Sequence, residues 1–142
     1  STEDYEKFWS AVQIRPQGVD VPTELRDMIV RQFAPGHSTT LLLVEIDINE
    51  DAQPEYLLVT ANNDYILGAY LYTFSAAGWR HSQMNMLYGA RRHADVEAYL
   101  RSVEVTLREP QLKDVQVGDL LLRAVDAEHL LAPAGATDPA NE

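Results

Sequence analysis

The sequence predicts a single α+β domain, in which two N-terminal helices and one long later helix pack on a central antiparallel sheet. Apolar residues recur at helical spacing in three segments, residues 2–14, 22–33 and 90–107. Between the second and third segments lie four runs rich in β-forming residues, separated by turn residues. At 142 residues the chain can bury a core without a disulfide or a structural metal.

Each N-terminal helix has start and stop signals. The first is predicted over residues 2–14, because Thr2 can cap its amino end and Pro16 follows its carboxyl end. Its apolar face consists of Tyr5, Phe8, Trp9 and Val12. The second is predicted over residues 22–33, since proline suits the first turn of a helix and Pro35 then stops it. Its apolar stripe consists of Leu25, Met28, Ile29 and Phe33.

The four β-rich runs predict an antiparallel meander, because short connections join them. The runs are residues 41–46, 56–61, 66–74 and 79–87. In the third run, Tyr70, Tyr72 and Phe74 share one face, and Leu71 and Thr73 share the other. One face must pack on the helices, and an aromatic face left exposed would mark a surface for a partner. The sequence leaves open which face the helices cover.

The C-terminal part of the chain predicts a helix, a hairpin and a tail. The helix is predicted over residues 90–107 from the spacing of Val96, Tyr99, Leu100, Val103 and Leu107. Alternating apolar residues on both sides of Gly118-Asp119 predict a closing hairpin that extends the same sheet. Residues 132–142 have almost nothing to bury, so we expect a flexible tail on a domain of residues 1–131.

Composition and charge exclude several classes of function. The chain has 22 acidic and 11 basic residues, a formal charge of -11, which repels nucleic acids and anionic lipid surfaces. We therefore expect no nucleic-acid binding and no direct lipid binding. The absence of cysteine excludes disulfides, zinc-thiolate sites and thiol catalysis. The apolar runs are too short to span a bilayer.

The clearest chemical signal lies in the connection between the first two β-rich runs. Oxygen-bearing side chains recur there at every second residue, at Asp47, Asn49, Asp51, Gln53 and Glu55. This spacing matches positions one, three, five, seven and nine of a D-x-[DN]-x-D calcium loop, in which the seventh position usually offers its backbone carbonyl. These five residues are therefore candidate Ca²⁺ ligands. The alternative is a solvated acidic hairpin loop that holds no ion.

The loop departs from the EF-hand pattern. Ala52 stands where an EF-hand has glycine, Leu58 stands where it has a bidentate glutamate, and the flanking segments are predicted strands. The loop locally resembles the D-x-D-x-D-G-x-x-[DE] loops that join strands in calcium-binding β-propeller repeats, although this chain has a single copy. Without the glycine, Ala52 must itself adopt the left-handed conformation of the tight turn.

No residue is predicted to be catalytic. The four histidines, His37, His81, His93 and His129, lack the spacing of a zinc site. His81 precedes a serine, but no G-x-S-x-G elbow is present, so a hydrolase is the least supported of the functional hypotheses. Neither G-x-G-x-x-G nor G-x-x-x-x-G-K-[ST] occurs, which excludes the common dinucleotide and nucleoside triphosphate sites.

A set of short motifs extends over nearly the whole chain. It comprises Phe8-Trp9, Pro16 to Gly18, the D-x-N-x-D-x-x-x-E-Y-L-L run from Asp47 to Leu58, Gly78-Trp79, and K-D-x-x-x-G-D from Lys113 to Asp119. This order resembles the soluble C-terminal domain of bacterial multi-pass inner-membrane proteins of unknown function. The resemblance implies an excised domain on the periplasmic side of the inner membrane, tethered to a membrane segment. It implies no reaction, and the residues themselves leave a cytoplasmic location open.

We therefore expect a non-catalytic binding or scaffolding domain of a membrane-associated protein. Its partner would be another protein or the membrane-tethered remainder of the same chain. Two other functions stay open: a module that Ca²⁺ stabilises through the loop, and an enzyme whose loop carboxylates hold a catalytic cation. An enzyme needs a pocket where the loop meets a base or a nucleophile, whereas a binding module needs an exposed apolar face.

Overall fold

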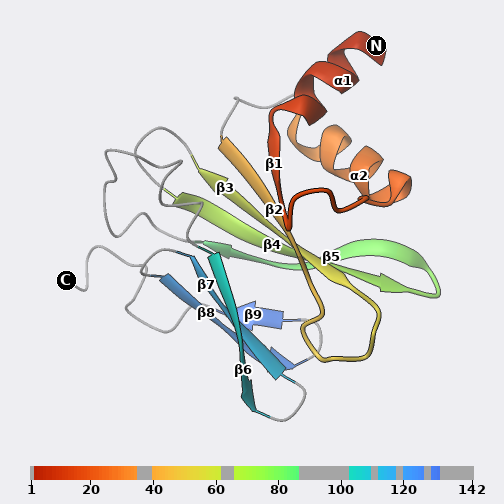
Figure 1. Cartoon of the computed structure of the whole chain (residues 1–142). Helices are drawn as coiled ribbons and strands as arrows, with labels where there is room; N and C mark the ends of the chain where they lie inside the picture. The colour runs from red at the N-terminus through yellow and green to blue at the C-terminus, as the bar shows by residue number, and fades with distance from the viewer. Residues whose placement is uncertain are drawn as a thin grey trace.

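The computed structural model describes residues 2–34, 40–61, 66–86, 103–109, 112–117, 120–126 and 129–131. In these residues two helices and two sheets form three layers (Figure 1). The helices lie on one side of a five-stranded sheet of order β1-β2-β3-β4-β5, and a four-stranded sheet of order β6-β7-β8-β9 lies on its other side. The predicted fold, one antiparallel sheet covered by three helices, is therefore wrong.

The first helix is shorter than predicted and leads into a strand. Helix α1 covers Thr2–Ser10, and strand β1, Val12–Arg15, pairs in parallel with strand β2, Thr40–Ile46. The Ser10 hydroxyl donates to the Lys7 carbonyl at 2.9 Å and closes the last helical turn. Val12 lies three residues after Trp9, so it fits a helical stripe as well as a strand. The β-branched residues of β1 alternate with polar ones, and its pairing with β2 favours the strand over the helix.

The second helix confirms the prediction to within one residue. Helix α2 covers Thr23–Phe33, and the Arg26 N–H donates to the Pro22 carbonyl at 2.9 Å in its first turn. Leu25 and Ile29 are fully buried against the sheet. Burial of two such side chains contributes roughly 3–6 kcal/mol to folding, which exceeds any effect of helix propensity here.

The meander is confirmed by strands β2 to β5, which are antiparallel neighbours. Strand β3 covers Glu55–Ala61, β4 covers Ile66–Ser75 and β5 covers Gly78–Met86. The helices cover the face that includes Leu43, Tyr56 and Tyr72. On the opposite face Leu42, Leu57 and Leu71 are also buried, because the second sheet lies there. Burial of both faces explains the continuous Leu-Leu-Leu-Val run of β2.

The prediction of a long C-terminal helix is wrong for the residues that the structure describes. Val103–Glu109 forms strand β6, which pairs antiparallel with β7, Leu112–Val117. Valines at 103 and 105 alternate with polar residues and have high β propensity, so this segment serves a sheet better than a helix. Residues 90–102, the remainder of the predicted helix, lie outside the described residues.

The closing hairpin forms but does not extend the meander. Strand β8, Leu120–Asp126, pairs antiparallel with β7 in a register that places Val115 opposite Leu122. The hairpin is the centre of the second sheet, between β6 and β9, His129–Leu131. The predicted tail, residues 132–142, lies outside the described residues. Neither α1 nor α2, the helices of the described part of the chain, has the length and apolar character needed to cross a bilayer.

Candidate metal centre

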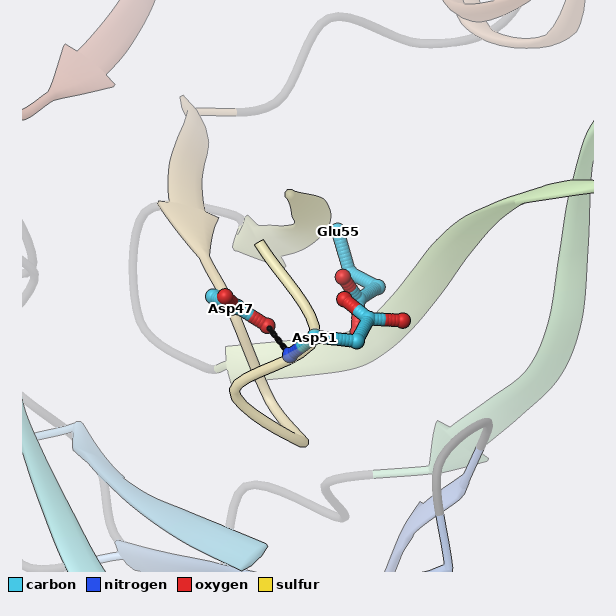
Figure 2. Close-up of side chains that lie close together, drawn as sticks. All are labelled: Asp47, Asp51 and Glu55. Atoms are coloured by element: carbon cyan, nitrogen blue, oxygen red, sulfur yellow. Dashed lines mark hydrogen bonds between the residues drawn. The ribbon is translucent and has the colours of Figure 1, made fainter. Parts of the chain in front are cut away.

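The acidic loop joins β2 to β3, and the sheet holds both of its ends. Ile46 and Glu55 are partners in the β2–β3 register, so residues 47–54 start and finish at adjacent points of the sheet. This geometry brings the carboxylates of Asp47, Asp51 and Glu55 together, with one oxygen of each within 4.8 Å of the others (Figure 2). The hairpin predicted from the sequence is therefore confirmed, and three of its five candidate ligands converge on one point.

Two carboxylates hold the backbone of the loop. Asp47 accepts the Asp51 N–H at 3.1 Å on Oδ1 (Figure 2) and the Ala52 N–H at 2.8 Å on Oδ2. Asp51 accepts the Gln53 N–H at 2.8 Å. These bonds wrap the chain around the Asp47 side chain. Each carboxylate oxygen has a second lone pair, so an oxygen that accepts an N–H can still bind a cation.

The left-handed turn expected at Ala52 is present. Ala52 has φ of 68°, and Glu50 has φ of 58°. A residue with a Cβ in this conformation costs roughly 1–2 kcal/mol, which the Asp47 hydrogen bonds and the docking of the loop must offset. The loop thus closes tightly without the glycine of other calcium loops.

Glu55 is the unusual group of the site. Its side chain is 4 % exposed, and among the described residues none donates a hydrogen bond of good geometry to either carboxylate oxygen. Burial, and then the negative charges of Asp51 and Asp47, raise the pKa of Glu55 to about 8. The Ile48 N–H and the Lys113 ammonium lower this pKa to a smaller extent. A carboxylate that is buried, unpaired and close to two others needs a proton or a cation as partner.

The two amide residues of the predicted site differ. The Asn49 Oδ1 is buried and has no hydrogen-bond partner among the described residues, whereas its amide nitrogen donates to Asp51 at 3.2 Å. Asn49 therefore contributes one more unpaired oxygen, on a side chain that is hydrogen-bonded to Asp51 of the cluster. The Gln53 side chain is exposed, and its backbone carbonyl is the ligand that the loop pattern predicts at this position.

Sequence reasoning missed two residues that border the site. Lys113 of β7 donates its backbone N–H to the Ile48 carbonyl at 3.0 Å, and its ammonium lies 3.7 Å from Glu50. No local pattern could connect Lys113 to a loop so distant in sequence. The Thr73 hydroxyl is also buried without a partner in the described part of the chain. Tyr56 pairs with Tyr72 in the β3–β4 register, so the same register extended by one residue brings Thr73 next to Glu55.

The oxygen atoms of the site suit a hard cation. Ca²⁺ takes six to eight oxygen ligands from carboxylates, amides, backbone carbonyls and water, whereas zinc prefers nitrogen and sulfur. His81 is not close to the site, because its ring packs edge-on against Tyr70 and Tyr72 on the helix side of the sheet. Glu55 is adjacent to Tyr56 on β3 and therefore points to the opposite side.

Comparisons with protein-family models, with curated proteins and with solved structures found no match for this chain. The resemblance to C-terminal domains of inner-membrane proteins therefore stays a prediction from the sequence.

Proposed function

We propose that this chain is a non-catalytic binding or scaffolding module whose loop of residues 47–55 binds a Ca²⁺ ion in the folded state. The observation that carries the proposal is Glu55, a buried carboxylate whose oxygens receive no hydrogen bond of good geometry from the described residues. One of its oxygens lies within 4.8 Å of one oxygen of Asp47 and one of Asp51. A divalent cation at this point would neutralise the mutual repulsion of the three charges and supply the missing partner.

The ligand set favours Ca²⁺ over the other common divalent cations. Asp47, Asp51 and Glu55 offer carboxylate oxygens and Asn49 offers an amide oxygen, so water and the Gln53 carbonyl can complete a shell of six to eight. Mg²⁺ requires near-octahedral geometry at shorter distances and gives up its water reluctantly. A site built largely from one loop adapts more easily to the longer and more variable distances of Ca²⁺.

The proposed site suits an extracytoplasmic location. Calcium modules of extracellular proteins bind with dissociation constants of roughly 0.1–1 mM. Ala52, held in a strained conformation that the binding energy must help to offset, predicts affinity in this weak range. We infer that the domain works on the periplasmic side of a membrane, where such an affinity is useful.

The proposed partner is another protein or the membrane-tethered remainder of the same chain. The charge of -11 disfavours nucleic acids and anionic lipids as partners. The helices cover Tyr70 and Tyr72, so the aromatic face left open in the sequence is largely used for packing. Phe74 stays 47 % exposed beside Trp79 and is the part of this face that a protein partner could contact.

The test is thermal unfolding in excess EDTA and then in millimolar Ca²⁺. We expect Ca²⁺ to raise the melting temperature, because a ligand that binds only the native state stabilises it, by about 2.7 kcal/mol at one hundred times Kd. Glu55→Gln keeps the shape of the side chain and should lose the response. Glu6→Gln, which removes the same charge from an exposed position of α1, should keep it. The proposal is wrong if the wild type shows no shift or if Glu55→Gln shifts equally.

A further inference from the structure

Successive residues of the loop face two different parts of the molecule. Asp47, Asn49 and Asp51 contribute the oxygens of the candidate cation site. The residues between them, Ile48 and Glu50, contact β7 of the second sheet instead. One short segment therefore belongs at once to the cation site and to the junction between the two sheets.

The contacts with β7 involve both backbone and side chain. Ile48 is fully buried, and its carbonyl accepts the Lys113 N–H at 3.0 Å. The Glu50 carboxylate lies 3.7 Å from the Lys113 ammonium, and the lysine side chain is only 22 % exposed. The ammonium also acts on Glu55, whose pKa it lowers. Lys113 therefore lies within electrostatic reach of the carboxylates that would bind the ion.

We propose that a cation bound at Asp47, Asp51 and Glu55 fixes the docking of the four-stranded sheet on the five-stranded sheet through Ile48, Glu50 and Lys113. This inference rests on the proposed function. A bound ion favours the loop conformation in which Glu50 and Ala52 are left-handed, and the same conformation presents the Ile48 carbonyl and the Glu50 carboxylate to β7. Ion binding and sheet docking then stabilise each other, and the coupling is reciprocal.

The direct test is amide hydrogen exchange of the whole chain in EDTA and in saturating Ca²⁺. The reference is α2, where Leu25 and Ile29 are fully buried and far in the fold from the second sheet. Amides of α2 report global unfolding, so Ca²⁺ slows them only as much as it raises overall stability. We expect the amides of Lys113, Asp114 and Val115 to exchange faster than those of α2 in EDTA, through local undocking, and to be slowed by Ca²⁺ by the same factor as α2, because undocking then requires release of the ion. Without coupling, undocking leaves the ion bound and the exchange of these amides does not respond to Ca²⁺.

The outcomes separate this inference from the proposed function. If Ca²⁺ raises the melting temperature and slows α2 but leaves the exchange of β7 unchanged, the ion site stands and the coupling is wrong. The coupling is also wrong if β7 exchanges no faster than α2 in EDTA. If Ca²⁺ changes neither quantity, the ion site itself is wrong. Ca²⁺-dependent protection of β7 that disappears in Glu55→Gln supports both.

A pair of variants tests whether Lys113 transmits the effect. Lys113→Met keeps the stem of the side chain and removes a positive charge near the ion. Glu50→Gln removes the other partner of the ion pair and leaves the three clustered carboxylates in place. If Lys113 acted on the ion by charge alone, Lys113→Met would tighten Ca²⁺ binding and leave the protection of β7 unchanged. Coupling predicts that both variants lose most of the Ca²⁺-dependent protection of β7.

Discussion

Glu55 and Tyr56 are neighbours on β3 and face opposite sides of the same sheet. Tyr56 is 2 % exposed, donates its hydroxyl to Glu45 at 2.8 Å and packs edge-on against Trp79. Glu55 is 4 % exposed and has no hydrogen-bond partner among the described residues. Burial costs a polar group little when it is paired and much when it is not. The fold therefore satisfies the polar group of Tyr56, whereas the buried carboxylate of Glu55 needs a proton or a cation as its partner.

The same contrast extends over the two sides of the sheet. On the helix side, Tyr72 is fully buried, and its hydroxyl donates to Gln32 at 2.8 Å. Tyr72 and Tyr56 have raised pKa values, mainly because of burial, so both stay protonated and act as donors. On the other side, the unpaired oxygens of Asn49, Glu55 and Thr73 concentrate near the loop. Unpaired buried oxygens gathered in one place are typical of an ion or water site.

The largest expected effect is on the helix side. Tyr72→Ala should lower the free energy of unfolding by roughly 3–5 kcal/mol, because it removes a fully buried ring and its hydrogen bond to Gln32. Phe74→Ala, on the same strand and face but 47 % exposed, is the matched control and should cost under about 1 kcal/mol. Urea denaturation of both variants measures this. Equal losses would show that packing under α2 does not dominate the stability.

The next effect is the pH dependence of the metal-free protein. The pKa of Glu55 is about 8 in the fold against 4.5 for the free group, so the folded state binds the extra proton between these values. Protonation of Glu55 contributes fully to the free energy of unfolding below pH 4.5, and this contribution is lost as pH rises through 8. The stability of the metal-free protein should therefore fall across this pH window. Melting temperatures across this range check the sign. Saturating Ca²⁺ should remove most of the fall.

Glu55→Gln provides the control for that pH dependence. Because glutamine does not titrate, the variant should show a flatter profile in EDTA. Above pH 8 it should be more stable than the metal-free wild type by about 1–3 kcal/mol, since an unpaired buried charge is gone. A profile that stays as steep as in the wild type would assign the titration to another group.

A smaller effect is expected at the neighbouring tyrosine. Tyr56→Phe keeps the ring against Trp79 and removes the hydroxyl that donates to Glu45. The loss should be about 0.5–1.5 kcal/mol and should not depend on Ca²⁺. Melting curves with and without Ca²⁺ test this directly. A Ca²⁺ response that changed in Tyr56→Phe would mean that the two sides of the sheet are not independent.

The smallest effect concerns the strained turn. Ala52→Gly should relieve a φ of 68° and stabilise the native loop, but glycine also gains entropy in the unfolded chain. The net gain should be a few tenths to about 1 kcal/mol, with tighter Ca²⁺ binding. Calcium titration by calorimetry and urea denaturation measure the two quantities. Weaker Ca²⁺ binding would contradict the proposed ligand geometry.

Local patterns predicted what depends on nearby residues. The stripe of α2, the β-rich runs of the meander and the alternation of oxygens from Asp47 to Glu55 are local signals, and each appears in the structure close to its predicted position. The left-handed Ala52 followed from the missing glycine. The errors came where one pattern fits two structures: Val12 fits both a helical stripe and a strand, and Val103 to Leu107 fit both a helical period and β6.

By itself the sequence determined the composition, the absence of cysteine, the acidic loop and the elements whose periodicity has a single reading. Only the tertiary structure decided that β1 joins the sheet in parallel, that the C-terminal strands form a second sheet, and that Lys113 meets the loop. The same holds for the burial of Glu55, which makes an ordinary acidic residue the centre of the candidate site. Local preferences extend over a few residues, whereas strand partners and burial depend on segments far apart in the chain.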